Sequence, residues 1–577
     1  MDRADRRTFL ARAAALASAG ASLAGASRAG AMGPGRADGD AAPVPAGTSA
    51  AGKITAATIA EAERLAGITF TDAERAQLLR TIEGLREQLA ARVRAGTPPN
   101  HLAPAEAFRA ELPGSQVVPV TASGDPSELP LLKVPAAAPD GEELCWEGIP
   151  RLAAMLRAGV ITSERLVRAC LDRIDRLNPR LLCAITVTRE HAIARAQAMD
   201  AELREGKWRG PLHGVPYAAK DILDTAGIRT TWGAEPWKDR VPGQDAWVVR
   251  ALDRAGAVLV AKSAVGALAY GDIWFGGTCR NPWNPEQGSS GSSAGSASGV
   301  AAGLFPFAIG TETLGSIVSP CVRCGASGLR PTFGRVPRTG CMSLVWSMDK
   351  VGAIARSAAG CGVVLGAING HDPMDPCSVD RPFRWSMSQD ARGLRVGIAP
   401  GWFDGPDPGA RAGIEAALRD AGARIIEVRP PDADPTPLLV PLLAESAAAF
   451  EDLTRSGSDD ALAWQADEAW PNTFRQAWFI PAIELVQASR LRRAAMESMD
   501  RFFAQADAFV APPFAGNMLL LTNSCGQPCA VARAGFGADG QPRSATAMSR
   551  LFDEGTALRV ASALEDRLAA DARRPNP

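Results

Sequence analysis

Short apolar runs alternate with amphipathic stretches over the region from residue 142 to residue 567. In residues 149–158 and 162–177, apolar side chains recur at steps of three and four, which predicts two helices, the second capped by Thr162. Short runs rich in Val, Ile and Leu predict strands at residues 257–261, 394–398 and 423–428. A helical pattern separates the last two runs, as in a strand–helix–strand unit. This alternation predicts an α/β domain.

Two helical patterns precede this domain. The first runs from Thr55 to Ala66 and ends at Gly67, and glycine is a common residue at a helix C-terminus. Thr71 and Glu74 then form a capping-box pattern that predicts the start of a second helix. Its apolar positions are Leu78, Leu79, Ile82, Leu85, Leu89 and Val93. The two segments together predict a helical hairpin.

Composition separates the remaining segments. Stretches rich in Gly, Ala and Pro cannot bury enough apolar surface to fold alone, which predicts linkers on both sides of the hairpin. The predicted organisation is a signal peptide at 1–31, a disordered linker at 32–52, the helical hairpin at 53–95, a Pro-rich extended linker at 96–140, the α/β domain at 141–567 and a frayed tail at 568–577.

The first thirty-one residues have the pattern of an export signal. Arg6 and Arg7 precede Phe9-Leu10, a mildly hydrophobic run follows, and Ala29-Gly30-Ala31 resembles a cleavage site. Paired arginines with a weak apolar segment are typical of the twin-arginine route. We therefore expect a periplasmic or secreted protein. No other stretch reaches eighteen uninterrupted apolar residues, so no membrane span is predicted.

Charge and cysteine usage narrow the function classes. The 62 basic and 63 acidic residues leave a net charge of −1, which argues against a nucleic-acid-binding face. The eleven cysteines are expected to be buried as small apolar side chains, because twin-arginine cargo folds in a reducing compartment. Cys321 and Cys324 have the spacing of half a zinc site, but no second such pair and only four histidines exist to complete it. We expect no metal and no cofactor.

Lysine is scarce, and one lysine has an unusual context. The chain has seven lysines, at positions 53, 133, 207, 220, 238, 262 and 350, and Arg supplies the other basic residues. Lys220 lies in the stretch GVPYAAKD, directly before Asp221. Arginine cannot be deprotonated in a protein, whereas a buried lysine can. Lys220 is therefore a candidate base.

A segment rich in Ser and Gly at residues 286–303 admits several interpretations. A flexible linker is disfavoured, because the segment runs directly into an apolar, helix-forming stretch. The nucleophile elbow of α/β-hydrolases, matched by residues 291–295, needs a later acid and histidine, and only His371 follows. The pattern S-x-x-K at Ser347–Lys350 lacks its companion K-T-G, because no lysine follows position 350. A phosphate-binding loop is excluded because no G-K-[ST] closes the segment.

Taken together, the motifs between residues 210 and 340 resemble the amidase signature family. The matching pieces, in order, are GVPYAAKD at 214–221, DAWVVR at 245–250, NPW at 281–283, GSSAGS at 291–296, GTETLGS at 310–316 and CGASGLRPT at 324–332. Weaker matches at 523–528 and 551–554 extend the resemblance over roughly three-quarters of the chain. The resemblance implies an α/β fold with a large mixed central β-sheet and helices on both faces.

The resemblance also implies a catalytic triad. Ser316 would be the nucleophile, Ser292, preceded by a cis peptide bond at Gly291, the proton relay, and Lys220 the base. Lysine has a reference pKa of about 10.4, so burial must lower it by several units before Lys220 can act near neutrality. Backbone N–H groups of Thr313, Leu314, Gly315 and Ser316 would hold the oxyanion, with Ser293 as a further substrate-binding residue.

Three residues depart from the family pattern GTDTGGSIR. Glu312 stands for Asp, Leu314 for Gly and Val318 for Arg. The acid–base pair beside the turn is therefore expected to lack its arginine. Leu314 would strain the turn if its φ angle were positive. We interpret these changes as a branch of the family with a reshaped, more apolar pocket.

The function predicted from the sequence is hydrolysis of a carboxylic amide through a serine acyl-enzyme. The expected partners are a small-molecule or peptide-like amide and no nucleic acid, and a homodimer is allowed. One alternative is a catalytically silent binding protein that kept the fold, with Leu314 blocking the anion hole. Another is a glutaminase-type amidotransferase subunit, which the predicted export, the near-zero charge and the lack of a basic glutamine-binding motif at 470–495 disfavour.

Overall fold

The computed structural model describes most of the chain beyond residue 53. The signal peptide predicted at 1–31 and the linker predicted at 32–52 lie outside the described residues. Those described are 54–94, 97–104, 106–113, 124–128, 132, 134–404, 409–569 and 573–577.

An eleven-stranded mixed sheet runs through the molecule in the order β1-β3-β2-β8-β10-β9-β14-β15-β13-β11-β12. Its strands are β1 (Ala184–Val187), β2 (Pro216–Lys220), β3 (Val258–Ser263), β8 (Phe307–Glu312), β9 (Ser327–Arg330), β10 (Lys350–Ala355), β11 (Arg395–Ile398), β12 (Arg424–Glu427), β13 (Ala508–Ala511), β14 (Cys529–Phe536) and β15 (Pro542–Ser549). Strand β2 is parallel to both β3 and β8, and β11 is parallel to both β12 and β13. The other neighbouring pairs are antiparallel.

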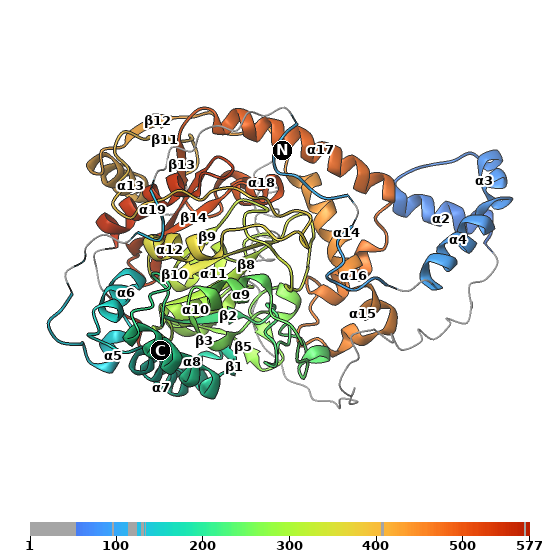
Figure 1. Ribbon diagram of the computed structural model, residues 1–577. Helices are drawn as coiled ribbons and strands as arrows, with labels where there is room; N and C mark the ends of the chain where they lie inside the picture. Colours follow the sequence, from blue (N-terminus) through green and yellow to red (C-terminus); the bar gives the residue numbers. More distant parts are fainter. Residues whose placement is uncertain are drawn as a thin grey trace.

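Helices cover the sheet, as Figure 1 shows. Those of the α/β domain are α5 (Gly141–Leu144), α6 (Ile149–Arg157), α7 (Ser163–Leu181), α8 (Arg189–Arg204), α9 (Trp247–Arg254), α10 (Ala294–Ala301), α11 (Val318–Cys324), α12 (Ala358–Ile368), α13 (Gly409–Asp420), α14 (Leu439–Ala449), α15 (Glu451–Ser456), α16 (Trp470–Ala477), α17 (Ala482–Phe503), α18 (Met518–Cys525) and α19 (Glu554–Leu568). Short 3₁₀ turns lie at 235–237, 267–269, 436–438, 458–461 and 515–517, and two-stranded ribbons are β4 (Ile273–Trp274) with β5 (Gly277–Thr278) and β6 (Arg280–Asn281) with β7 (Asn284–Gly288).

The predicted fold class is confirmed, and so are the helices and strands that pattern indicated within the α/β domain. The predicted helices at 149–158 and 162–177 are α6 and α7, and Thr162 accepts a hydrogen bond from the N–H of Arg165 as the N-cap. The predicted strands are β3, β11 and β12. Helix α13 connects β11 to β12, and the two strands are parallel, as the strand–helix–strand pattern predicted.

The second helix of the predicted N-terminal hairpin is divided in two. Helix α2 (Ala56–Ala66) ends at Gly67 in the left-handed conformation, and Thr71 and Glu74 form the predicted capping box. The helix that begins there, α3 (Asp72–Leu79), stops at Arg80, and α4 (Ile82–Arg94) begins two residues later. The prediction of one helix through Val93 is therefore wrong: the apolar period continues across the break, and periodicity does not reveal an interruption. The three helices project at the right of Figure 1.

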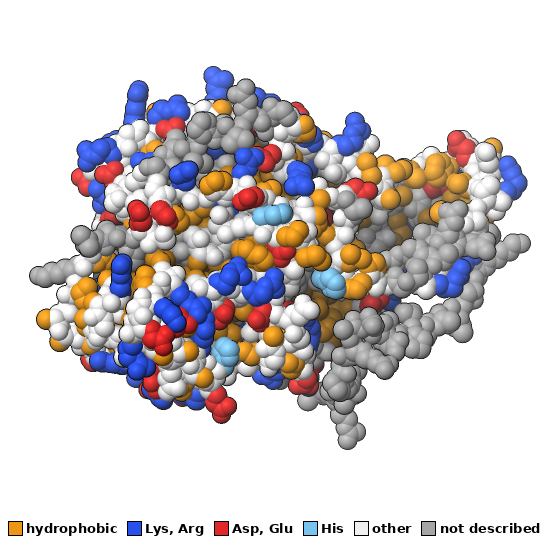
Figure 2. Space-filling model, in the orientation of Figure 1, with side chains coloured by type: hydrophobic (Ala, Val, Ile, Leu, Met, Phe, Trp, Pro, Cys, Tyr) orange, Lys and Arg blue, Asp and Glu red, His pale blue; other side chains and the backbone are white. Residues whose placement is uncertain are grey.

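The interior consists of one large apolar cluster and a small second one of Ala110, Phe333 and Cys377, and together they include every cysteine. Strands β2, β3, β8, β9, β10 and β13 are buried along their whole length, as expected for strands covered on both faces. All eleven cysteines are free and buried, which confirms the prediction that they serve as small apolar side chains. On the outside, acidic and basic side chains are interspersed (Figure 2).

The described part of the chain contains neither a candidate membrane-spanning helix nor a candidate group of metal ligands. None of its helices is long and apolar enough to cross a membrane. No group of three or more His, Cys, Asp or Glu side chains within it is arranged to hold a metal ion.

Strands β2 and β8 meet through a stacked pair of aromatic rings. The rings of Tyr217 and Phe307 lie 5.4 Å apart at 12°, and Phe307 is fully buried. We expect Phe307→Ala to lower the free energy of unfolding by about 3–5 kcal/mol, because the truncation leaves a cavity between the strands. Denaturant unfolding measures this change. Val241→Ala, at an exposed position, is the control and should stay within about 0.5 kcal/mol of the parent. A loss at Phe307 no larger than at Val241 would contradict the packing described.

Candidate active site

Lys220 is the last residue of β2 and is wholly buried. Strand β8, the parallel neighbour of β2, ends at Glu312, so the carboxyl ends of both strands lie at the same edge of the sheet. Ligand sites of α/β folds form at this edge. The Lys220 side chain thus starts from a fixed point of the sheet and reaches the loops beyond it.

The two serines of the Ser-Gly segment lie where α10 begins. The peptide bond between Gly291 and Ser292 is cis, as the resemblance implied, and Ser293 is the residue before Ala294, the first residue of α10. Gly291 is required here, because a Cβ atom at this position would overlap the carbonyl oxygen of Gly271. Asp272 accepts a hydrogen bond of 2.8 Å from the N–H of Ser290 and holds the segment in place. The close packing fixes both serines against Lys220.

The amino group of Lys220 contacts only uncharged oxygens. Its Nζ donates to Ser292 Oγ at 2.8 Å, to Ser293 Oγ at 3.1 Å, and to Thr311 Oγ1 and the Thr311 carbonyl at 2.8 and 3.3 Å. Burial lowers the pKa of Lys220 from 10.5 to about 7, although the more distant carboxylates of Asp349 and Glu312 act in the opposite direction. A substantial fraction of Lys220 is therefore neutral near pH 7. The predicted contact between Lys220 and Ser292 is confirmed.

Thr311 is a site residue that the sequence reasoning missed. It is hydrogen-bonded to Ser293, for which the resemblance implied a role in substrate binding. The Ser293 hydroxyl donates to the Thr311 carbonyl at 3.1 Å and accepts from the Thr311 N–H at 3.1 Å as well as from Lys220. These contacts use its only proton and both lone pairs. Ser293 therefore holds Lys220 against β8, and its hydroxyl has no proton left for a substrate. The signal for Thr311 was its position two residues before Thr313 in the same motif.

Ser316 lies in the turn between β8 and α11. Its carbonyl accepts a hydrogen bond of 3.0 Å from the N–H of Ser293, which joins the turn to the serine segment. The structure thus places Lys220 and Ser292 in direct contact. Ser316 is hydrogen-bonded to Ser293, the residue that follows Ser292. Among the described residues, however, the hydroxyls of Ser292 and Ser316 share no hydrogen bond. The link between these two serines stays a prediction.

Gly315, not Leu314, has the left-handed conformation in this turn. Gly315 has a φ of 83°, and a Cβ there would lie 3.3 Å from Leu519, whereas Leu314 is not among the described residues with positive φ. The strain considered for Leu314 is therefore absent. Among the described residues, none accepts a hydrogen bond from the N–H groups of Thr313, Leu314, Gly315 or Ser316. Free N–H groups on successive residues of a turn can bind an anion.

Glu312 has an arginine partner after all, so the expectation that the pair had lost its arginine is wrong. Arg330, on β9, donates to Glu312 Oε1 at 2.7 Å, and both side chains are fully buried. Asn523 donates to the same oxygen at 2.8 Å. Oε2 accepts from the N–H groups of Ile317 and Val318 at 2.8 and 2.9 Å and so fixes the start of α11. Arg330 comes from a strand that is distant in sequence, which is why comparison of the turn motif alone missed it.

The carboxylate of Glu312 stays charged in this setting. Burial by itself raises its pKa, but Arg330, the Val318 N–H and Asn523 outweigh burial and lower the pKa to about 2. The turn that carries Ser316 is thus held by a permanent negative charge at its base.

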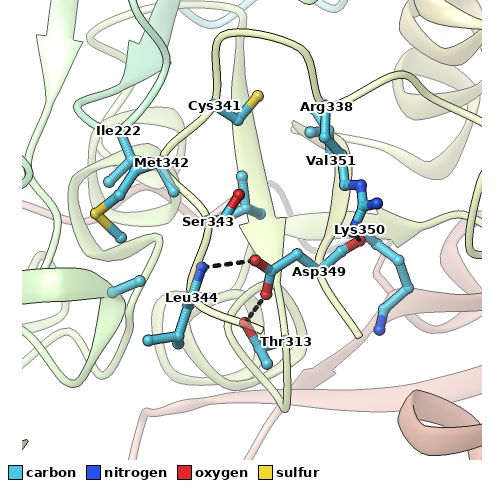
Figure 3. A pocket seen from close by; sticks show the side chains of 12 residues that line it. Ile222, Thr313, Arg338, Cys341, Met342, Ser343, Leu344, Asp349, Lys350 and Val351 are labelled. Atoms are coloured by element: carbon cyan, nitrogen blue, oxygen red, sulfur yellow. Dashed lines mark hydrogen bonds between the residues drawn. The ribbon is translucent and has the colours of Figure 1, made fainter. Parts of the chain in front are cut away.

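A narrow pocket opens beside the turn, and Figure 3 shows its lining. Its wall combines the apolar side chains of Ile222, Ala269, Met342, Leu344 and Val351 with polar ones, among them Arg338, Asp349 and Lys350. Asp349 accepts from the Thr313 hydroxyl at 2.6 Å with one oxygen and from the N–H groups of Leu344 and Val345 at 2.8 and 3.0 Å with the other. Asp349 and residues 341–344 are further site residues that the sequence reasoning missed, because no motif in the sequence marks them.

Comparison with known proteins agrees with this architecture. A family model described as Amidase matches residues 165–531. The chain belongs to the Amidase family. The resemblance stated from its motifs is therefore confirmed.

Relatives of this amidase-family chain include amidotransferase subunits and amidases. A glutamyl-tRNA(Gln) amidotransferase subunit from Carboxydothermus hydrogenoformans is 32% identical, and the match covers 75% of this chain and 99% of that one. The corresponding subunit of Chloroflexus aurantiacus is 34% identical over 71% of this chain and 94% of its own. Among solved structures, the native peptide amidase from Stenotrophomonas maltophilia is 31% identical, with a TM-score of 0.65 over 74% of this chain and 98% of that one.

The buried pair of Glu312 and Arg330 generates a stability prediction. Glu312→Gln keeps the size of the side chain but leaves the Arg330 charge unpaired, so we expect a loss of about 3–5 kcal/mol in the free energy of unfolding at pH 7. Because the folded-state pKa is depressed, this contribution is present above pH 4.5 and is lost as the pH falls from 4.5 towards 2. Denaturant unfolding at pH 7 and at pH 3 measures both effects.

The matched control is Glu164→Gln, which removes a carboxylate from the partly exposed surface pair with Arg168. We expect a change within about 0.5 kcal/mol, since surface pairs contribute little. Equal losses in the two variants would show that the buried pair does not hold the turn.

Proposed function

We propose that this protein hydrolyses carboxylic amides through an acyl-enzyme on Ser316, with Ser292 as the proton relay and Lys220 as the base. The observation that supports this most directly is the Lys220 amino group, buried without a carboxylate in contact and 2.8 Å from the Ser292 hydroxyl. A lysine in such surroundings is poised to accept a proton at neutral pH. Membership of the Amidase family agrees with this chemistry.

The proposed reaction begins when neutral Lys220 takes the Ser292 proton as Ser292 takes the proton of Ser316. Ser316 Oγ then attacks the amide carbonyl carbon, and the carbonyl electrons move to oxygen. When the tetrahedral intermediate collapses, the C–N bond breaks and the amine leaves with a proton returned from Lys220 through Ser292. A water molecule, deprotonated by the same route, attacks the ester and releases the acid and Ser316. Contact between the two serines would form on substrate binding, since catalytic hydrogen bonds often tighten only then.

The free N–H groups of residues 313–316 would stabilise the negative charge on the substrate oxygen. One donor of this kind contributes about 10²- to 10³-fold in kcat. The ordinary φ of Leu314 keeps its main chain in a conformation that leucine adopts without strain. This argues against a silent binding protein in which Leu314 blocks the anion hole.

The pocket lining favours an uncharged acyl group. Met342, Leu344 and Ile222 are apolar, and both oxygens of Asp349 are occupied by hydrogen bonds from the protein. The charge of Arg338 is compensated by Asp375. Burial lowers the pKa of Lys350, the other basic residue of the lining, and its amino group donates to the carbonyls of Met348 and Asn523. A charged substrate group placed here would lose its hydration without gaining a partner. We therefore propose a small or peptide-like amide with an apolar acyl portion, turned over outside the cytoplasm if the predicted signal is used.

A glutaminase-type amidotransferase subunit is the second candidate, because the sequence relatives named above carry that name. It predicts release of ammonia from glutamine. Hydrolysis of apolar acyl amides without turnover of glutamine supports the first proposal, and the reverse result supports the second.

The test of the nucleophile is covalent labelling. A serine-directed sulfonyl fluoride should label the wild-type chain once, at Ser316, and peptide mass spectrometry locates the label. Ser316→Ala should abolish labelling and lower kcat by roughly 10⁴- to 10⁶-fold. Ser319→Ala, a buried serine on the next turn of the chain, is the matched control and should label normally. Labelling that survives in Ser316→Ala would overturn the assignment.

The test of the base is the pH profile. Lys220 must be neutral to accept a proton, and its pKa lies near 7, so kcat/KM should fall tenfold per pH unit below about pH 7. Lys220→Ala should lower kcat by roughly 10²- to 10⁴-fold. Lys220→Arg should be no better, because arginine stays charged. Near-normal activity of the arginine variant would show that position 220 supplies only a positive charge.

A further inference from the structure

A segment from the N-terminal region lies against the outer side of the pocket wall. Residues 97–104, called the strap below, precede the α/β domain and were predicted to be part of an extended linker. The described strap contains no helix or strand, yet it is joined to the domain at several points. One of them is the Thr97 hydroxyl, which donates to Asp452 on α15 at 2.6 Å.

Asn100 is the central contact of the strap. Its side-chain oxygen accepts from the N–H of Ser343 at 2.7 Å, and its side-chain nitrogen donates to the carbonyl of Ser343 at 2.8 Å. The same nitrogen lies 3.4 Å from the carbonyl of Ala449, and the backbone carbonyl of Asn100 accepts from Trp346 Nε1 at 3.1 Å. The amide of Asn100 thus pairs with both backbone groups of one residue, as a neighbouring strand would.

Ser343 is itself part of the pocket lining, so Asn100 is hydrogen-bonded to a residue of the pocket wall. The residues after Ser343 continue the connection, because the N–H groups of Leu344 and Val345 bind one oxygen of Asp349. The other oxygen of Asp349 binds the Thr313 hydroxyl. An unbroken series of contacts therefore runs from Asn100 through Ser343 and Asp349 to the turn that carries Ser316, and Figure 3 shows its inner part.

We propose that Asn100 is a positioning residue, and that the strap is a built-in part of the pocket which holds residues 343–345, and through Asp349 the anion-binding turn, in the geometry that the transition state needs. The proposal rests on the proposed amide hydrolysis. A loop that moves by an ångström displaces Thr313 and the neighbouring N–H donors, and such displacements cost about 10²-fold in rate. The strap supplies what the α/β domain alone lacks, a partner for both backbone groups of Ser343.

A downstream anchor of the same chain provides a control for stability. The ring of Phe108 meets Phe333 edge-on at 5.0 Å, and the guanidinium carbon of Arg492 lies 3.5 Å from its centre. Phe108→Leu weakens this anchor and leaves every hydrogen bond of Asn100 in place. His101, the exposed neighbour of Asn100, provides a control for the local change in sequence, as His101→Ala.

The test compares full-length variants in turnover of an apolar acyl amide and in thermal stability. Asn100→Ala should lower kcat by roughly 10- to 100-fold with KM changed less than threefold, because the wall positions the transition state more than the ground state. Asn100→Asp keeps the size and the acceptor for the Ser343 N–H but loses both donated bonds, so an intermediate loss is expected. His101→Ala should match the wild type. Phe108→Leu should lower the melting temperature without lowering kcat.

Hydrogen–deuterium exchange gives a readout that does not depend on turnover. Peptides covering residues 313–316 and 341–349 should exchange faster in Asn100→Ala than in Phe108→Leu. If this difference is found but no amide is hydrolysed by the wild type, the proposed function fails and the role of the strap stands. Unchanged exchange and kcat in Asn100→Ala overturn the strap proposal. A second outcome also overturns it. If kcat falls with the melting temperature in the same way in the Asn100 and Phe108 variants, Asn100 acts only through overall stability.

Discussion

The amino group of Lys220 lies in the interior at the end of β2, and its four hydrogen bonds all go to uncharged oxygens. Burying an ammonium group with no opposing charge in contact costs free energy. Burial therefore favours the neutral form of Lys220 and lowers its pKa to about 7. Every neighbouring element serves this condition. Strand β8 brings Thr311, the start of α10 brings Ser292 and Ser293, and no carboxylate of the described residues contacts the amino group.

Two carboxylates, of Glu312 and Asp349, lie near Lys220, but their hydrogen bonds go to other groups. Glu312 pairs with Arg330 across the sheet, and its second oxygen caps α11. Asp349 binds a hydroxyl and two backbone N–H groups. Both carboxylates therefore act as structural supports of the turn, at the cost of a moderate upward influence on the pKa of Lys220. The site separates two tasks: uncharged groups surround the amino group of Lys220, and the side chains of Glu312 and Asp349 hold the backbone.

This separation explains how the turn motif can change without strain. The position after Thr313 carries a side chain here, and the left-handed conformation belongs to the next residue, Gly315. Val318 stands where the family pattern has an arginine, and Arg330 supplies a positive charge to Glu312 instead. Arg330 lies on β9, which is separated from β8 by β10 in the sheet. In the same way the strap completes a pocket wall that the domain leaves without partners on one side. Compensation comes through space, from residues distant in sequence.

The sequence by itself determined the helices α6 and α7, the unit of β11, α13 and β12, and the family, because periodicity, caps and spaced motifs are local signals. It also predicted Lys220, Ser292 and Ser316 as site residues, and the structure places the first two in contact. It did not reveal the break at Arg80, since an apolar period runs through it. Only the tertiary structure decided that Arg330 meets Glu312, that Ser293 supports the lysine and that residues 341–344 and 349–351 line the pocket. These facts depend on which strands become neighbours, and strand order arises from packing of the whole chain rather than from any short stretch of it.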